Sequence, residues 1–301
     1  MSPGQKVVIH IDKDKPPNIP DCESIIKQSF ELIDSQTTDT NISGVRIRLS
    51  SGTSDRDVSD IWVKFGLDIR MNEARTQQLV AQYLEEHETA AVRAPRVYLA
   101  FTSGRIGFIV SEYIDGHRCR YSKADIARVA AAVQALLKIP SPSAVPGPVG
   151  GGIIEHPFFI EQTSDIWYES VEELEGHVNG ILAATDRTQW HVDLKSEVAH
   201  TGLILCASDI HHSNFMTDRR RGGQLVAVAF GGYAFLPPSF FALALELSSK
   251  FAYNVGLLLE YPKAPSTGAN SVALCNASWG MVPFGTNALG LKRQLRSRRA
   301  R

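Results

Sequence analysis

The spacing of apolar residues changes once along this chain, and the change divides the sequence into two parts. Up to about residue 116, short apolar runs alternate with turn residues, and the stretch Val45–Leu49 alternates apolar and polar side chains as a half-buried strand does. From Ser122 onward, apolar residues recur at intervals of three and four, the spacing of a helix with one buried face. We therefore predict an α+β chain of two lobes, residues 1–116 with a small antiparallel sheet and residues 117–301 mostly helical.

The first lobe is predicted to combine strands with one main helix. The segments "GVRIRLSSG" and "DIWVKFG" indicate an antiparallel pair of strands separated by a polar turn. A helix is expected over about residues 70–88, where apolar side chains recur among good helix formers. Two further strand-like runs, "PRVYLAF" and "GFIVSEYI", follow it. The predicted order is strand, strand, helix, strand, strand.

The second lobe is predicted to be helical around a short pair of strands. Ser122 can cap a helix that stops at Pro140, and Ser170 and Glu173 have the spacing of a capping box at the start of another. The runs "GLILC" and "LVAVAFGG" indicate two short strands on either side of a polar cluster. After residue 238 the chain is expected to be helical to its end.

Composition argues against several classes of protein. The 301 residues are 44% hydrophobic with a formal net charge of −1, so the chain can bury a sizeable core and has no overall field to attract nucleic acid or an acidic membrane. Its four cysteines stand far apart without a CxxC pair, which argues against a zinc knuckle or a disulfide framework. We expect a cytoplasmic protein that binds neither nucleic acid nor membrane, with no signal segment and no membrane span.

The polar cluster "SDIHHSNF", residues 208–215, is the best candidate for a site of chemistry. In phosphoryl transfer, an aspartate receives the proton of the attacking hydroxyl, and an asparagine five residues later holds magnesium. Asp209 and Asn214 have this spacing, although both residue types also favour ordinary loops. Lys64 lies on a predicted strand and Glu73 on the next helix, the pair that holds nucleotide phosphates in such sites. Taken alone, both would also suit solvated surface positions.

With these residues in place, the chain resembles the aminoglycoside phosphotransferase and choline-kinase-like family of the protein-kinase-like fold, in the form common in fungi. The resemblance runs from about Val45 to Gly290 and depends on the order of "WVKFG", "NEA", "APRVYLAF", "GFIVSEYIDG", "SDIHHSNF", "AFGGYAFLPPSF" and "NALGL". It implies a small-molecule kinase with ATP and Mg²⁺ in the cleft between the lobes. The family roles then fall on the catalytic base Asp209, the phosphate pair Lys64 and Glu73, the metal ligand Asn214, and the hinge residues Glu112, Tyr113 and Ile114 beside adenine.

Three positions depart from the family pattern. Ala207 stands where a histidine often precedes the catalytic aspartate. A glycine-rich nucleotide loop is not evident, although Ser50, Ser51 and Gly52 could cover phosphates. The third departure is the most serious, because Ala229 occupies the place of the magnesium-binding aspartate in an Asp-Phe-Gly triplet.

The alanine at position 229 bears directly on activity. Alanine has no side-chain oxygen to bind a hard cation, so we expect phosphoryl transfer to be slower by at least about a hundredfold. The nearest carboxylate in sequence, Asp218, lies in a turn and is expected to point away, so no substitute is apparent. The alternative to an impaired kinase is a pseudokinase, a module that binds nucleotide or another ligand without transfer.

An acidic segment bears on the substrate. Between Glu155 and Glu175 there are seven acidic side chains and no lysine or arginine, with aromatic residues among them. Such a segment suits a cationic amine or amino-sugar, to which Asp165 and Glu169 would contribute, but acids near a helix start can also simply face water. His211 and His212 are spaced neither for a zinc pair nor for a triad, which favours scaffold or substrate-contact roles.

Overall fold

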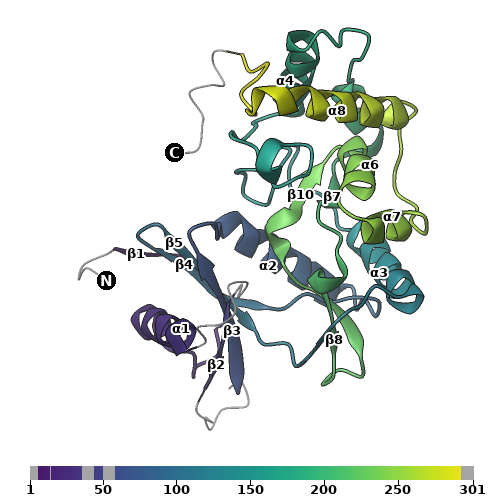
Figure 1. The fold of residues 1–301 in the computed structure, drawn as a ribbon. Coiled ribbons are helices and arrows are strands. Elements are labelled where there is room, and N and C mark those ends of the chain that lie inside the picture. The colour runs from purple at the N-terminus through teal and green to yellow at the C-terminus, as the bar shows by residue number, and fades with distance from the viewer. Residues whose placement is uncertain (1–5, 14, 36–43, 50–57, 293–301) are drawn as a thin grey trace.

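The chain folds into a sheet-based N-terminal lobe and a mostly helical C-terminal lobe (Figure 1). A computed structural model describes residues 6–13, 15–35, 44–49 and 58–292. The α+β prediction, with an antiparallel sheet in the first lobe and helices in the second, is confirmed. The segment 50–52, predicted to cover phosphates, lies outside the described residues.

The N-terminal lobe contains a five-stranded antiparallel sheet in the order β1-β4-β5-β3-β2. The predicted pair "GVRIRLSSG" and "DIWVKFG" is present, with Val45 opposite Val63. The next neighbour of β3 is β5, which places Lys64 opposite Ile109. The strands are β1 (Val7–Asp12), β2 (Val45–Arg48), β3 (Asp60–Gly66), β4 (Val97–Ser103) and β5 (Ile106–Glu112).

One face of this sheet is covered by a helix that the predicted order lacks. Helix α1 (Cys22–Ser35) packs Ile25 and Ile26 against the buried side chains of Ile61 and Val63. Strand β1 was also not anticipated, because it is an edge strand with a single buried residue, Ile11, and so lacks a clear alternation. These elements extend the predicted order at its N-terminal end.

Helix α2 (Met71–Glu86) covers the opposite face of the sheet, and its bounds lie close to the predicted 70–88. Ala74 packs against Ile109 of the sheet, whereas Val80 and Leu84 belong to the hydrophobic core of the C-terminal lobe. Figure 1 accordingly shows α2 between the sheet and the helical lobe. Because it packs against both lobes, α2 fixes the position of the sheet relative to the C-terminal lobe.

A glycine-rich loop of the C-terminal lobe receives the first turns of α2. The backbone N–H of Val149 donates to Thr76 Oγ1 at 3.1 Å, and the side chain of Asn72 lies against Gly152. A Cβ atom on Gly152 would stand 2.7 Å from Asn72 Nδ2, and the residue has φ +121°, so both space and backbone conformation call for glycine. The close approach holds the start of α2 against the C-terminal lobe.

The C-terminal lobe is built from six α-helices and three short strand pairings within the described residues. The predicted caps are present: Ser122 Oγ accepts from the N–H of Asp125, and Ser170 Oγ accepts from that of Glu173. The helices are α3 (Lys123–Leu136), α4 (Val171–Ala184), α5 (Leu194–Thr201), α6 (Pro238–Leu247), α7 (Lys250–Gly256) and α8 (Thr267–Met281). None of the helices in the described ranges is long and apolar enough to span a membrane.

Short strands and single helical turns frame the polar cluster. Strand β10 pairs with β7, and β9 and β6 pair with β8. Strand β6 joins the second lobe through the pairing of Gly116 with Asp218, next to the predicted boundary at 116/117. The strands are β6 (Gly116–Arg118), β7 (Ile204–Ala207), β8 (Phe215–Asp218), β9 (Gln224–Ala227) and β10 (Tyr233–Leu236); the 3₁₀ turns are η1 (Ile160–Gln162), η2 (His212–Asn214), η3 (Phe230–Gly232) and η4 (Val282–Phe284).

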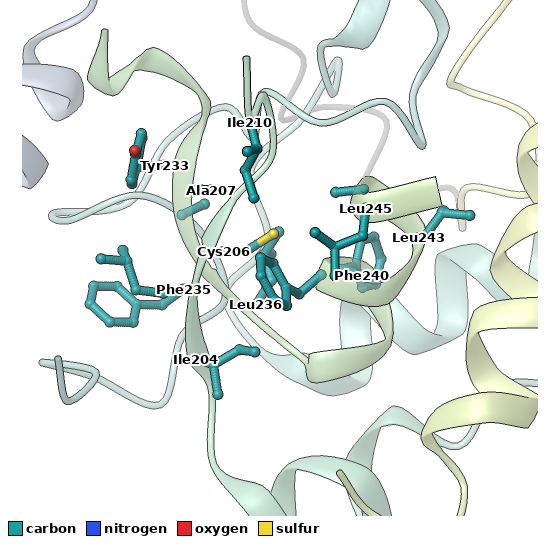
Figure 2. Close-up of a cluster of buried hydrophobic side chains, with 14 of the residues drawn as sticks. Ile204, Cys206, Ala207, Ile210, Tyr233, Phe235, Leu236, Phe240, Leu243 and Leu245 are labelled. Carbon is teal, nitrogen blue, oxygen red and sulfur yellow. The ribbon is translucent and has the colours of Figure 1, made fainter. Parts of the chain in front are cut away.

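The hydrophobic core of the C-terminal lobe includes Ile210 of the polar cluster and residues of the neighbouring strands β7 and β10 (Figure 2). The pairing of Tyr233 with Ala207 continues through a hydrogen bond of 2.9 Å from the N–H of Ser208 to the carbonyl of Gly232. The loop after β7 and the turn before β10 therefore lie side by side. The core residues labelled in Figure 2 are Ile204, Cys206, Ala207, Ile210, Tyr233, Phe235, Leu236, Phe240, Leu243 and Leu245.

Two buried histidines make the stability of the fold dependent on pH. His156 Nδ1 accepts from the N–H of Phe158, so its Nε2 donates to the carbonyl of Phe240, 2.9 Å away. His177 lies 2.7 Å from the hydroxyl of Tyr168. Burial lowers the pKa of His156 to about 3 and that of His177 to about 4, because both imidazoles lose water that would stabilise the charged form.

We expect the free energy of unfolding to fall by about 2 kcal/mol for each histidine between pH 6.5 and pH 5. In that window the unfolded chain binds protons at His156 and His177 and the folded chain does not, so acid favours unfolding; above pH 6.5 the effect vanishes. Urea denaturation at pH 7 and pH 5 measures it. The double variant His156→Gln/His177→Gln should lose most of this pH dependence, and an unchanged dependence in the variant would contradict the assignment.

Candidate active site

Lys64 and Glu73 form an ion pair at the boundary between the lobes. Because side chains alternate along β3, Lys64 faces away from the α1 side of the sheet and toward α2. Its Nζ lies 2.6 Å from Glu73 Oε1, and Glu73 is buried in the first turn of α2. The exposed fraction is 24% for the lysine side chain and 6% for that of the glutamate. The partly exposed ammonium is thus fixed by an acid that water scarcely reaches.

The loop after β7 holds Asp209 and Asn214 together. Asn214 Nδ2 donates to Asp209 Oδ2 at 2.8 Å and to the carbonyl of Asp209 at 2.9 Å. The turn η2, which ends at Asn214, brings the two side chains together across five residues. With its N–H groups bound to Asp209, the amide keeps its Oδ1 as an acceptor for another group. The aspartate is held in one orientation.

One cavity brings the lysine and the aspartate to the same space. It has a volume of about 300 Å³ and is lined by Lys64, Asp209 and Ala229 among others. Gly232 lies directly beside Asp209, since a Cβ atom there would stand 3.7 Å from Asp209 Cβ. Three positions predicted from separate segments therefore meet at one cavity: Lys64, the catalytic-base candidate Asp209, and Ala229 in place of the metal-binding aspartate.

The backbone at Ala229 adopts a conformation that alanine disfavours. Its φ of 64° and ψ of 67° lie in the left-handed region, immediately before the turn η3. A Cβ atom makes this region unfavourable, whereas glycine, asparagine and aspartate enter it more readily. Outliers of this kind cluster at functional sites. The local backbone therefore suits an aspartate better than the alanine that stands there.

The predicted hinge residues lie at a different cavity. Glu112 and Tyr113 line a space of about 470 Å³ that shares no lining residue with the cavity of Lys64 and Asp209. Glu112 Oε2 accepts from Arg93 Nη1 at 2.7 Å, and the guanidinium of Arg46 lies 4.2 Å from the ring centre of Tyr113. Ile114 is buried. The structure therefore does not bring these residues to the cavity where the lysine and aspartate meet.

The two histidines of the polar cluster pack against each other and bond to their surroundings. Their ring centres are 4.0 Å apart. His211 Nδ1 lies 2.6 Å from Ser213 Oγ, and His212 Nδ1 lies 3.2 Å from the carbonyl of Cys119. Burial and the neighbouring His212 lower the pKa of His211. Neither ring lines the cavity; His211 contacts its own loop, and His212 contacts the segment after β6 and Phe251 of α7.

The acidic segment reaches the cavity through other residues than those singled out from sequence. Asp165 accepts from Asn287 Nδ2 at 3.3 Å, and Glu169 is exposed just before α4; neither lines the cavity. Glu155 and Glu161 of the same segment do line it. Glu155 and Glu161 reach the cavity because of the path of the loop before α4, and no local pattern in the sequence predicts that path.

Glu155 is the most enclosed acid of this segment at the cavity. Its Oε1 accepts from Arg70 Nη1 at 2.5 Å, which joins the C-terminal lobe to the start of α2. Burial raises the pKa of Glu155, and the opposing effect of Arg70 is smaller. The carboxylate is therefore poorly hydrated, and the charges of Lys64 and Glu73 also act on its pKa.

The oxygen donors at the cavity suit a magnesium ion, although position 229 contributes none. Asn214, in contact with Asp209, offers one amide oxygen but does not itself line the cavity. Asp218 is held by Arg93 and the N–H of Arg220, away from the cavity as expected. Across the described residues, no group of three His, Cys, Asp or Glu side chains could hold a metal ion. Magnesium usually takes one or two carboxylates and completes its shell with water and substrate phosphates. The carboxylates of Asp209 and Glu155 are of this chemical kind.

Comparisons with known proteins add neither a family nor a close relative. No protein-family model and no curated protein sequence matches the chain. Solved structures with some likeness include a choline kinase from Streptococcus pneumoniae (16% identity, 87% of this chain and 90% of that one, TM-score 0.41). Others are an ethanolamine kinase from Plasmodium vivax (14%, 86% and 83%, 0.40) and an aminoglycoside phosphotransferase from Streptomyces rimosus (12%, 87% and 100%, 0.38). At these identities and TM-scores we draw no conclusion from them.

Proposed function

We propose that this chain is a kinase-like phosphotransferase scaffold of the aminoglycoside phosphotransferase and choline-kinase-like type. It would bind ATP and transfer its γ-phosphoryl group to a hydroxyl of a small molecule, slowly because of Ala229. The observation that carries the proposal is the Lys64–Glu73 ion pair of 2.6 Å at a cavity that Asp209 also lines. A strand lysine fixed by a helical glutamate, opposite an aspartate and an asparagine five residues apart, is the arrangement that kinases use.

Nucleotide binding is assigned to the N-terminal side of the cavity. The ammonium of Lys64 would bind phosphate oxygens through charge-assisted hydrogen bonds, and Glu73 would keep it from turning into solvent. The segment Glu112–Ile114 is proposed as the adenine contact, because it runs from the end of β5 toward the second lobe. Glu112 and Tyr113 line a separate cavity from Lys64, so adenine would extend beyond the cavity that holds the phosphates. We propose position 116/117 as the division between the lobes.

The proposed reaction needs one proton acceptor and one oriented hydroxyl. Asp209 would accept the proton of the acceptor hydroxyl while the hydroxyl oxygen forms a bond to the γ-phosphorus of ATP. At the same time the bond between this phosphorus and the bridging oxygen would break, and ADP would leave. Asn214 holds the carboxylate for this task through its bond to Oδ2. Magnesium, when bound, supplies neutralisation of phosphate charge, and Asn214 would be one of its ligands.

The acceptor is proposed to carry a positive charge, as an amine or amino-sugar does. The support is the acidic segment between Glu155 and Glu175, which has seven acids and no lysine or arginine and reaches the cavity through Glu155 and Glu161. A cationic molecule entering there would meet a negative rim. Asp165 and Glu169 would act at longer range from outside the cavity lining.

A pseudokinase is the second candidate, and Ala229 is the observation that favours it. A chain without a metal-binding aspartate can still bind nucleotide through Lys64 and Glu73. Both candidates bind ATP, but only the impaired kinase transfers phosphate. A carboxylate restored at position 229 therefore distinguishes them, because it should increase transfer only in the kinase.

ATP binding tests the part that both candidates share. We expect the chain to bind ATP by isothermal titration calorimetry, and Lys64→Met to weaken binding by about tenfold to a hundredfold, because a hydrogen bond to a charged group contributes about 1.5–3 kcal/mol. Lys138→Met removes an exposed lysine after α3 and should leave the affinity unchanged. Absence of ATP binding, or equal binding by Lys64→Met, would overturn the proposed function.

A further inference from the structure

Glu155 reaches the turn in which the expected metal-binding aspartate is missing. It belongs to the irregular segment between α3 and α4 and lines the same cavity as Ala229. Its Oε2 stands 2.7 Å from the place where a Cβ atom on Gly231 would lie. The carboxylate therefore rests against the backbone two residues beyond Ala229, and the absence of a side chain at Gly231 makes room for it.

The turn η3 separates this carboxylate from the catalytic-base candidate by a pair of glycines. Gly231 faces Glu155, and Gly232 faces Asp209, whose Cβ lies 3.7 Å from the ideal Cβ position on that glycine. Both acids line the cavity. Asn214 Nδ2 donates to Asp209 Oδ2. Carboxylates from two separate segments thus approach one turn, although the turn itself carries none.

Only one oxygen of Glu155 is occupied by a protein donor. Arg70 Nη1 contacts Oε1, and in the described part of the chain no hydrogen-bond donor contacts Oε2, the oxygen nearest Gly231. The side chain is 35% exposed, so it is enclosed yet open to a ligand from the cavity. A hard cation accompanying a polyphosphate is the ligand that such an oxygen prefers.

We propose that Glu155 partly compensates for the carboxylate that position 229 lacks and contributes a ligand to the magnesium ion of bound MgATP. This inference rests on the proposed function and deepens it. Magnesium needs only one or two carboxylates when phosphates and water complete its shell. Glu155 belongs to a segment far from Ala229 in the sequence, so the residues next to Ala229 do not predict this role.

The metal dependence of ATP affinity tests the proposal without any measurement of transfer. Calorimetric titrations with ATP are run with Mg²⁺ and again with EDTA, and the ratio of the two affinities is compared between variants. We expect Mg²⁺ to strengthen ATP binding by the native chain, and Glu155→Gln to reduce that ratio by about tenfold, since even supporting groups of a metal site are worth that much. The affinity in EDTA should change little.

Two control variants separate metal ligation from other roles of the acid. Glu161→Gln makes the same chemical change at an exposed position of the same cavity and should keep the native ratio. Arg70→Gln breaks the ion pair between the lobes but leaves Glu155, so it too should not lower the ratio. In the background of Glu155→Gln, the further change Ala229→Asp should restore the ratio.

Each contrary result has its own meaning. A native ratio in Glu155→Gln, or an equal loss in Arg70→Gln, would overturn the ligand role, the second because the ion pair alone would explain the effect. ATP binding that is indifferent to Mg²⁺ in the native chain would overturn it while leaving ATP binding intact. No ATP binding under either condition would overturn the proposed function and this inference together.

Discussion

Ala229→Asp is expected to raise the rate of phosphoryl transfer by at least about a hundredfold, which corresponds to about 2.7 kcal/mol of the activation barrier. The new carboxylate would stand in the cavity with Lys64 and Asp209 and add a strong oxygen ligand beside the phosphates. The left-handed backbone at position 229 accepts aspartate more readily than alanine, so the fold should not resist the change. ATP turnover against a panel of amines and amino-sugars, for both proteins, measures the effect.

The matched control for this prediction is Ala229→Asn. Asparagine has nearly the same shape and also tolerates the left-handed region, but it brings no charge. Both variants should be at least as stable as the native chain, whereas only the aspartate should increase the rate markedly. If the aspartate variant binds MgATP and still transfers phosphate to no acceptor, the impaired-kinase reading is wrong and the pseudokinase alternative stands.

Glu197→Ala is expected to lower the free energy of unfolding by about 4 kcal/mol, because each buried donor left without an acceptor costs about 1–3 kcal/mol. The Glu197 side chain in α5 is completely buried. Its carboxylate accepts from the N–H and hydroxyl of Ser239, from Thr267 Oγ1 and from Asn270 Nδ2, each at 2.8 Å. It thereby joins α5 to the first turns of α6 and α8.

Urea denaturation of the native chain and two variants measures this contribution. Glu246→Ala is the control, since it truncates an exposed glutamate on α6 and should change the free energy of unfolding by no more than about 0.5 kcal/mol. A loss below about 1 kcal/mol in Glu197→Ala would show that these four hydrogen bonds contribute little to stability.

Much of the fold follows from short-range patterns. Alternation predicted the pairing of "GVRIRLSSG" with "DIWVKFG", and three-four spacing predicted α2 to within two residues at each end. Ser122 and Ser170 were recognised as helix caps because a cap depends on three consecutive peptide units. Strand β1 escaped prediction because an edge strand with one buried residue has no alternation to detect.

The candidate site likewise has a part that the sequence predicts and a part that it does not. The spacing of Asp209 and Asn214 is a local property, and the observed bond between their side chains spans a single turn. Lys64 and Glu73 are only nine positions apart in the sequence, because β3 is followed almost directly by α2. The hinge residues were placed by resemblance and the substrate residues by the composition of the acidic segment. The structure puts Glu112 and Tyr113 at a different cavity and Asp165 outside the cavity lining.

The sequence by itself determined the fold class, the order of the elements from β2 to β5, the catalytic-loop spacing and the absence of a carboxylate at position 229, because these depend on residues within a few positions of one another. Only the tertiary structure decided that Glu155 lies against Gly231 and that Glu197 binds donors from two other helices. Those contacts join segments brought together by packing of the whole core, which no local pattern of residues encodes.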